Sequence, residues 1–443
     1  MAQPSGFVPR ASRPLDLVVF GASSFVGRLL CEELWRLYGS GPDGGTGGPL
    51  RWGLAGRSRA RLEAVRDGLR ARAEGEPSAA RGAASGLPCL VADAADAGSL
   101  AALCRQARVV VSTVGPYALH GEPLVAACAA SGTDYADLTG EVPWIRRMIE
   151  RHSAAALASG ARLVHCCGFD SIPSDLGVLF LQREAQRRLG APCARVSMRV
   201  RAMRGGVSGG TVASLLNVLR EAAADPVLRR MLVDPYSLSP TESAEVAGAR
   251  RPRQPRTRGA RFDPESGCWT APFVMSAINV PVVLRSHALL GHPWGGGFTY
   301  DEAVSTGRGL PGRLRASGLA AGLAAFTVAG ALAPTRALLE RFVLPAPGEG
   351  PDEPSRRRGC FDLRFMGTTA DGRHLAARVT GDRDPGYGST ARMLAQAATC
   401  LTETTDEPAR RGGSWTPASL LGERLIERLE AFAGVKFELL PGR

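Results

Sequence analysis

The stretch LDLVVFGASSFVG, residues 15–27, decides the fold. Its first six residues are nearly all apolar and have the length of a buried parallel strand. Gly21 permits a tight turn after this strand, and Gly27 permits the following helix to approach the strand closely. The main-chain amides at the start of such a helix can bind a pyrophosphate at the positive end of the helix dipole. The stretch therefore predicts the first strand, turn and helix of a Rossmann-type dinucleotide-binding domain.

The central position of this turn differs from the usual pattern. Ser24 stands there instead of glycine, so its side chain narrows the approach of a phosphate while its hydroxyl can donate a hydrogen bond. We expect the turn to bind the cofactor through Gly21, Ser23, Ser24, Phe25, Val26 and Gly27.

The residues after the second expected strand indicate which cofactor is preferred. An acidic residue at this point would accept a hydrogen bond from the ribose hydroxyl of NAD. The sequence has Arg57 and Ser58 instead, which can donate to a 2′-phosphate. We therefore expect NADP, with NAD also possible. Asp93 is expected beside the adenine, and Thr113 and Gly115 beside the nicotinamide.

Short apolar runs alternate with segments of helical pattern over the first 190 residues. The candidate strands are residues 15–20, 51–55, 90–92, 109–114, 134–138 and 162–166. Such alternation predicts parallel strands whose connecting helices cover the sheet. The expected fold is thus α/β, a Rossmann-type doubly wound parallel sheet.

Changes of composition divide the chain into four parts. Residues 1–14 are expected to be a flexible leader, 15–190 the dinucleotide-binding domain, 191–389 a substrate or dimerisation domain, and 390–443 C-terminal helices packed back on the Rossmann domain. Residues 316–335 are uncharged and rich in alanine and glycine, so they have the length of a transmembrane helix but insert weakly. A membrane span, a helix packed on the protein or a dimer partner, and a peripheral lipid contact all stay open for this segment.

Composition excludes several kinds of chemistry. The net charge of +12 comes almost wholly from arginine, because Lys436 is the only lysine. A lysine Schiff base or a tyrosine–lysine pair is thereby excluded upstream of the C-terminus. The ten cysteines show no Cys-x-x-Cys spacing, and no metal site is expected. Without a signal-peptide pattern, we expect reduced cysteines and a cytoplasmic protein, possible contact with a membrane or lipid droplet being peripheral.

Further motifs follow in order along the chain. They are GASSFVG, LAGRS, TVGPY, DYADLTGE, GFDSIPSDLG, SGGT, DPY, GCWTAPFVM, DPGYGSTA and WTPASLLGERLIERL. Together they resemble the saccharopine dehydrogenase-like oxidoreductases and are most similar to the trans-acting enoyl reductases, over Leu15 to Phe437. This resemblance implies a second α/β (α+β) domain inserted before the C-terminal helices. It also implies NADP-linked reduction of an unsaturated acyl intermediate in complex lipid or glycolipid synthesis. It maps the cofactor site to Gly21, Ser24, Phe25, Val26, Arg57, Asp93 and Gly115, and it implies no catalytic residue.

The candidate catalytic residues come from the chemistry of enoyl reduction, which needs a proton donor beside the hydride donor. Tyr117 and His120 follow the fourth expected strand, on the cofactor side of the sheet, and each is alternatively a packing residue. Asp170 follows the sixth strand and can act as an acid or cap the next helix, whereas capping is the preferred role of Asp175. The turns 139–141 and 168–171 are expected to converge on one crevice.

The expected partners follow from the same interpretation. The substrate is an acyl thioester or a lipid-linked acyl group, and a homodimer and a lipid surface are further possible contacts. The run ARRPRQPRTRGAR, residues 249–261, is either a solvated loop or a docking site for an acidic acyl carrier protein. In the docking hypothesis the contacts are Arg250, Arg251, Arg253, Arg256 and Arg258. Nucleic acid is not expected, because no aromatics are interleaved with these arginines. The alternative function is a non-catalytic nucleotide-binding protein of lipid surfaces.

Overall fold

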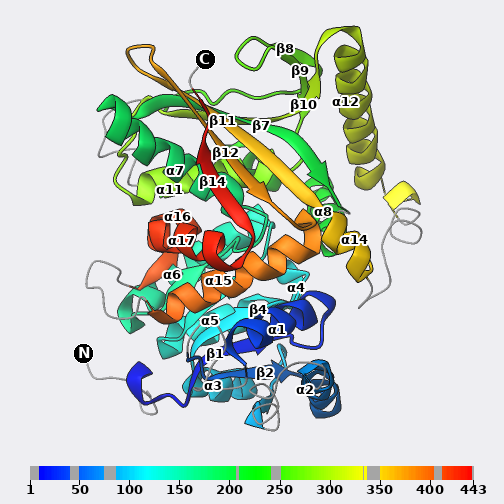
Figure 1. The fold of residues 1–443 in the computed structure, drawn as a ribbon. Coiled ribbons are helices and arrows are strands. Elements are labelled where there is room, and N and C mark those ends of the chain that lie inside the picture. The colour runs from blue at the N-terminus through cyan, green and yellow to red at the C-terminus, as the bar shows by residue number, and fades with distance from the viewer. Residues whose placement is uncertain are drawn as a thin grey trace.

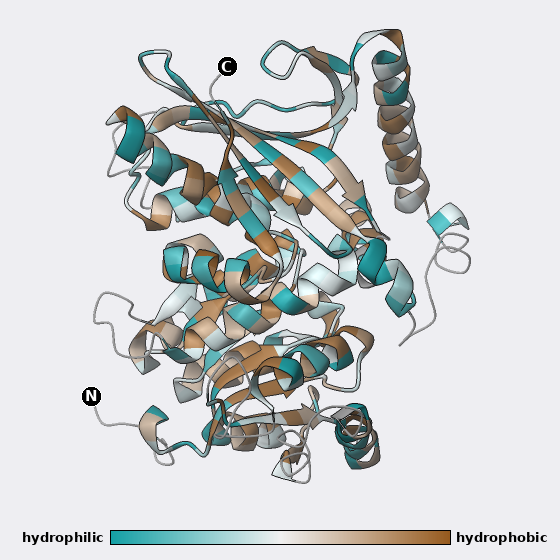
Figure 2. Ribbon diagram, in the orientation of Figure 1, coloured by the Kyte–Doolittle hydropathy of each residue, from teal (hydrophilic) through white to brown (hydrophobic). Residues whose placement is uncertain are grey.

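Two sheets dominate the structure, with a layer of helices between them (Figure 1). The computed structural model describes residues 9–39, 49–73, 86–205, 209–240, 251–332, 334–336, 350–403 and 412–441. The strands of the lower sheet are strongly apolar (Figure 2), as expected of strands that are covered on both faces.

The lower sheet is the Rossmann sheet, and all its strands are parallel. The strands are β1 (Leu15–Phe20), β2 (Trp52–Gly56), β3 (Cys89–Val91), β4 (Ala107–Ser112), β5 (Asp134–Asp137), β6 (Arg162–Val164) and β13 (Gly413–Trp415). Their order is β13-β6-β5-β4-β1-β2-β3. Because β1 pairs with both β2 and β4, successive strands are added first on one side of β1 and then on the other. Folds of this kind bind ligands at such a switch point, outside the carboxyl ends of the strands, here β1 and β4. The predicted fold class is confirmed.

The helices of this domain connect its strands. They are α1 (Phe25–Tyr38), α2 (Arg59–Ala73), α3 (Ala97–Gln106), α4 (Tyr117–His120), α5 (Glu122–Ser131), α6 (Val142–Ser159) and α7 (Ile172–Leu189). The apolar runs read as strands in the sequence are strands in the structure, with ends shifted by one or two residues.

The upper sheet is mixed and comes from the second domain. Its strands are β7 (Cys193–Arg204), β8 (Arg261–Asp263), β9 (Cys268–Pro272), β10 (Thr299–Gly307), β11 (Cys360–Thr369), β12 (His374–Gly381) and β14 (Val435–Leu439), in the order β14-β12-β11-β7-β10-β9-β8. Helices and short turns of the remaining chain are η1 (Arg10–Ser12), α8 (Gly209–Ala224), α9 (Pro226–Val233), α11 (Ser276–Leu289), α12 (Gly309–Ala331), α14 (Glu353–Arg358), η4 (Pro385–Ser389), α15 (Thr390–Glu403), α16 (Pro417–Leu420) and α17 (Gly422–Phe432).

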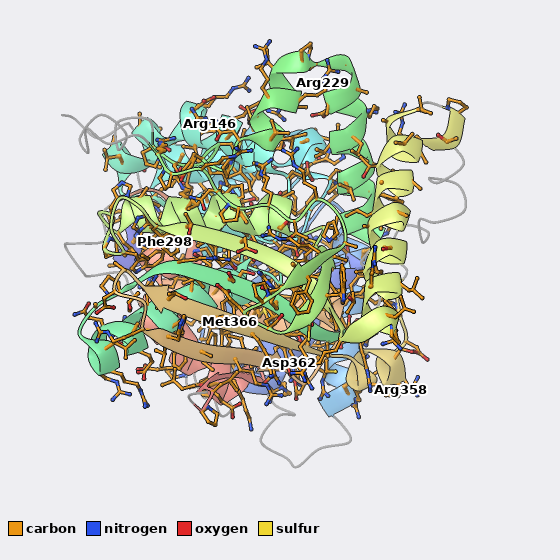
Figure 3. The ribbon with its side chains drawn as sticks, turned by 90° about the horizontal axis from the view of Figure 1, so that it is seen from above. Arg146, Arg229, Phe298, Arg358, Asp362 and Met366 are labelled. Carbon is orange, nitrogen blue, oxygen red and sulfur yellow. The ribbon has the colours of Figure 1, made fainter. Side chains whose placement is uncertain are left out.

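One apolar core joins the two sheets. It contains Leu17 and Val19 of the Rossmann sheet together with Phe361 and Phe365 of the upper sheet. Along β11, buried residues alternate with half-buried ones, since only one face of this sheet packs on the helix layer (Figure 3, where Asp362 and Met366 lie on the other face). A Cβ atom at Gly177 of α7 would lie 2.3 Å from the Phe365 ring, so the helix rests directly on the strand.

The chain is fixed to the Rossmann domain before β1 begins. Arg10 donates to the main-chain oxygens of Gly132 and Gly160 and pairs with Asp134 at 2.6 Å. The buried Arg13 donates to the oxygen of Ala107 at 2.9 Å. Within the described residues, the expected flexible leader is therefore wrong for 9–14.

The C-terminal segment also differs from the expectation. α15 packs on α1 and the Rossmann sheet as expected, and β13 extends that sheet. However, β14 pairs antiparallel with β12, so the end of the chain belongs to the upper sheet. A short apolar run at the end of the chain can predict a strand, but the run itself does not indicate which sheet that strand joins.

Candidate active site

The turn between β1 and α1 has the geometry of a phosphate-binding turn. Gly21 has φ of +86°, a conformation that favours glycine, and a Cβ atom there would lie 2.8 Å from the Thr113 hydroxyl. A Cβ atom at Gly27 would lie 2.1 Å from the main-chain oxygen of Gly21. Both glycines therefore keep strand, turn and helix in contact, and α1 begins at Phe25, directly after this turn.

Ser24 closes this turn by capping the helix. Its hydroxyl accepts from the Gly27 amide at 2.9 Å and lies 3.0 Å from the Thr113 hydroxyl. Thr113 in turn donates to the main-chain oxygen of Gly21 at 3.0 Å. The side chain of Ser24 is thus directed into the turn, which leaves the phosphate approach to the main chain of Ser23, Phe25 and Val26, all half-buried.

Phe25 is surrounded by one aromatic and two cationic side chains, an arrangement that the sequence analysis did not predict. The Phe25 ring packs edge-on against Tyr387 of η4, with centroids 4.9 Å apart. The guanidinium groups of Arg356 and Arg28 lie 5.7 and 5.9 Å from the same ring. Arg28 and Arg356 are distant in the sequence, yet both place a cation beside the first turn of α1, where an anionic pyrophosphate would bind. The motif DPGYGSTA contains Tyr387 but does not say what the tyrosine touches.

The residues expected at the adenosine end lie at the ends of β2 and β3. Arg57 is exposed, so its guanidinium group is accessible to a ligand. Ser58 caps the start of α2 by accepting from the Arg61 amide at 3.4 Å. Asp93 is half-buried, and one of its carboxylate oxygens accepts from the Ala95 amide at 3.0 Å.

Tyr117 has a structural role in the turn after β4. It is buried, and its hydroxyl donates to the main-chain oxygen of Ser112 at 2.9 Å. Burial raises the pKa of this hydroxyl well above its usual value, and the charge of Asp137 adds to the effect. The side chain is thus occupied within the protein, which argues against the expected role of proton donor.

His120 lies at the end of α4 and is exposed to solvent. Gly115 is also exposed, and a Cβ atom there would stay 3.7 Å from the Tyr117 ring. The turn is held by Glu141, whose carboxylate accepts from the amides of Tyr117 and Ala118, each at 2.9 Å.

Asp170 stands where three elements meet, at the carboxyl edge of the Rossmann sheet. A Cβ atom at Gly140, in the turn after β5, would lie 3.7 Å from the Asp170 carboxylate and 2.9 Å from Ile278 of α11. The turns 139–141 and 168–171 therefore converge, as expected. The residue is half-buried while its carboxyl group is surrounded by protein.

The environment of Asp170 favours a protonated carboxyl group. Burial raises its pKa to about 7, and the charge of Glu302 contributes to the same shift. Glu302 comes from β10 and is itself buried, with its carboxylate accepting from the Tyr300 hydroxyl at 2.7 Å and the Asn279 amide at 2.9 Å. Burial raises the pKa of Glu302 to about 7 as well. Sequence reasoning missed Glu302, because only the upper sheet brings it to the crevice.

Asp175 is buried in a different place. Its carboxylate accepts from the Ser286 hydroxyl at 2.5 Å and from the Ala418 amide at 2.8 Å. It therefore links α7 to α11 and α16, whereas the preferred role of capping its own helix is wrong: the cap position of α7 is Ser171.

The arginine-rich loop is more ordered than a solvated loop. Gln254 is buried and donates to the main-chain oxygen of Phe298 at 3.1 Å. Arg251 stacks on Tyr236 at 5.0 Å, and Arg256 donates to the main-chain oxygen of Val233. Arg250 lies outside the described residues. Of the expected docking arginines, Arg253, Arg256 and Arg258 are exposed.

A nicotinamide dinucleotide fits the residues of this crevice. The left-handed Gly21, the missing Cβ atoms at the start of α1 and the nearby arginines suit a pyrophosphate, and Arg57 suits an adenosine phosphate. Among the described residues, no group of three or more metal-binding side chains comes together.

Comparison with known proteins identifies the family. A Mycobacterium tuberculosis (strain ATCC 25618 / H37Rv) protein, provisionally named a trans-acting enoyl reductase, is 42% identical over 431 residues, covering 96% of this chain and 97% of its own. The trans-acting enoyl reductase of Mycobacterium bovis (strain BCG / Pasteur 1173P2) is 38% identical over 435 residues and covers 96% and 97%. The chain belongs to the trans-acting enoyl reductase family. It is an oxidoreductase, and its family resemblance is confirmed.

Solved structures show the same fold at low identity. Saccharopine dehydrogenase (L-Glu forming) from Saccharomyces cerevisiae aligns with a TM-score of 0.52 at 12% identity, covering 96% of this chain and 100% of the other. Homospermidine synthase from Legionella pneumophila, a complex with NAD, aligns with a TM-score of 0.51 at 9% identity, covering 97% and 91%. No family model matches the chain.

Proposed function

We propose that the protein reduces the carbon–carbon double bond of an unsaturated acyl thioester with NADPH, and that Asp170 donates the proton. The observation that carries this proposal is the protonated-carboxyl environment of Asp170 at the carboxyl edge of the Rossmann sheet. The names of the mycobacterial relatives support enoyl reduction as the reaction.

The chemistry divides between the cofactor and the chain. NADPH, when bound, supplies the hydride that one alkene carbon receives. Asp170 holds a proton at its carboxyl group near neutral pH and transfers it to the other carbon, which leaves the Asp170 carboxylate. A proton from solvent then restores the acid. The nearby charge of Glu302 favours this return, because a second negative charge in the same buried region is costly.

Asn279 and Tyr300 position Glu302 for this role. Both donate to its carboxylate, and Asn279 follows Ile278, which lies against the Gly140 turn. Since α11 and β10 belong to the second domain, docking of that domain on the Rossmann sheet assembles the acid pair.

Arg57 supports the preference for NADP over NAD. It is exposed directly after β2, at the position where an NAD-binding domain has an acidic residue. A charge-assisted contact with a 2′-phosphate is worth tenfold or more in affinity, roughly 1.5–3 kcal/mol in general. Arg57→Ala should weaken NADPH far more than NADH in calorimetric titration. Equal affinity of the unmodified protein for both cofactors would contradict the preference.

The substrate proposed here is an acyl group presented by another molecule in complex lipid or glycolipid synthesis, an acyl carrier protein being the expected carrier. The word "trans-acting" in the relatives' names supports such presentation.

The decisive experiment is NADPH oxidation with enoyl thioesters, followed at 340 nm with the saturated product identified by mass spectrometry. We expect turnover by the unmodified protein and a loss of roughly a hundredfold or more in Asp170→Asn. Cofactor binding without any reduction across a series of enoyl thioesters would favour the alternative, a non-catalytic nucleotide-binding protein of lipid surfaces.

A further inference from the structure

Helix α12 is apolar on nearly every side but is held to the protein by only one narrow face. That face contains Gly312, Ala316 and Gly330, which are buried. A Cβ atom at Gly312 would lie 2.3 Å from the Gly307 oxygen, and one at Gly330 would lie 2.7 Å from Leu219 of α8. The helix is therefore packed closely at both ends, along the margin of the molecule (Figures 1 and 3).

The remaining faces of α12 carry large apolar side chains into solvent. Exposed large apolar residues on and just after this helix are Leu310 (65%), Leu314 (64%), Leu319 (52%), Val328 (61%) and Leu332 (54%). No charged residue occurs from Ala316 to Leu332. A surface helix ordinarily has polar residues on its outer side, so a continuous exposed apolar surface of this kind marks a site of interaction. The hydropathy of α12 is visible in Figure 2.

Cationic side chains gather at the N-terminal end of this apolar surface. Arg308, Arg313 and Arg315 are all exposed. The guanidinium group of Arg313 lies 5.3 Å from the ring of Trp269 in the adjacent β9. Phe262 of β8 packs on Trp269 with centroids 6.0 Å apart and is itself 48% exposed. The apolar surface thus continues from α12 onto the hairpin β8–β9, with arginines between.

Charge and packing together indicate what kind of partner covers this apolar surface. A second copy of α12 would bring the same arginines and no counter-charge, since residues 309–332 contain no aspartate or glutamate. Anionic headgroups above an acyl layer complement both the cations and the apolar side chains. One helix of the described residues is long and apolar enough to cross a membrane. Crossing would remove Gly330 from its contact with Leu219 of α8, which favours a helix lying in the interface.

We propose that α12 and the β8–β9 hairpin dock the enzyme on the surface of an anionic phospholipid layer. The exposed apolar side chains of α12 then lie at the boundary between the headgroups and the acyl chains. This inference does not depend on the proposed reaction, because its test needs no turnover.

The test is sedimentation of the full chain with vesicles of phosphatidylcholine, with and without 30 mol% phosphatidylglycerol. The variant Leu314→Gln/Leu319→Gln/Val328→Gln should lose roughly tenfold or more of its partition into the anionic vesicles. Its matched control is Leu157→Gln/Val227→Gln/Val233→Gln, which replaces side chains of similar exposure on α6 and α9 and should bind like the unmodified protein.

A second pair of variants tests the charge. Arg308→Gln/Arg313→Gln/Arg315→Gln should lose roughly tenfold or more of its partition, and the loss should shrink as salt rises. Arg187→Gln/Arg188→Gln/Arg373→Gln lowers the net charge equally at other exposed sites and should bind normally. Equal partition of each variant and its control would overturn the proposal. So would a dimer in light scattering that the leucine variant dissociates, with no vesicle binding by the unmodified protein, because the occupant is then a second copy.

Discussion

Replacing Asp170 with asparagine should change both the rate and the pH dependence of stability. The side chain keeps its shape but can no longer ionise or donate a carboxyl proton. In the folded protein, burial and the charge of Glu302 raise the pKa of Asp170 from 3.8 to about 7. Because the folded-state pKa is raised, the protonated form is favoured, and stability is lost as pH rises from the unfolded-state pKa through the folded one.

The size of this effect follows from the shift. Each pKa unit corresponds to about 1.4 kcal/mol of free energy. For a change from 3.8 to about 7, linkage gives a cost of roughly 2 kcal/mol at pH 5 and roughly 4 kcal/mol at pH 8. The free energy of unfolding of Asp170→Asn, relative to the unmodified protein, should therefore improve by roughly 2–3 kcal/mol between pH 5 and pH 8.

Urea unfolding at the two pH values measures the stability, and NADPH oxidation from pH 5 to 9 measures the rate. The rate of the unmodified protein should fall as pH rises through about 7, since the donor must be protonated. Asp170→Asn should be slow throughout and lack this fall. Asp175→Asn is the matched control, because it removes a carboxyl with its pKa also raised to about 7 that bridges helices elsewhere. An unchanged rate in Asp170→Asn, or a stability difference that is the same at pH 5 and pH 8, would refute the reasoning.

Three other variants test separate parts of the structure. Glu302→Gln should move the fall in rate to lower pH, because removing the Glu302 charge lowers the pKa of Asp170; a profile that stays in place would contradict their interaction. Gly27→Ala should abolish cofactor binding in calorimetry, since its Cβ atom would lie 2.1 Å from a main-chain oxygen, whereas Gly68→Ala in open space on α2 should bind normally. Arg253→Ser/Arg258→Ser should slow turnover of carrier-bound substrate most at low salt, and rates that are the same across a salt series would leave these arginines without a role in docking.

The geometry of the turn between β1 and α1 could be predicted from the sequence. A strand, a tight turn and a helix are contiguous in the chain, and the constraint on Gly21 arises within that unit. The alternation of apolar runs determined the parallel sheet for the same reason, since each strand and helix carries its own pattern of burial. The positions of Arg57 and Asp93 at the carboxyl edge of that sheet could be predicted, because Arg57 directly follows β2 and Asp93 lies two residues after β3.

Tertiary structure decided the chemistry of the crevice. Asp170 and Glu302 are 132 positions apart, and a carboxyl group has an ordinary pKa unless burial and a neighbouring charge change it. Neither condition is visible in a sequence motif. The hydroxyl of Tyr117 likewise looks available in the motif TVGPY, yet folding directs it to a main-chain oxygen.

The outer surface of α12 shows the same division. The uncharged stretch 316–335 can be recognised in the sequence, but it is compatible with a membrane span, a packed helix or a peripheral lipid contact. Which faces of the helix the protein covers depends on α8 and β9, and their contacts leave the large apolar side chains outside. Pattern fixes what a segment can bury, whereas packing against distant segments determines what it does bury.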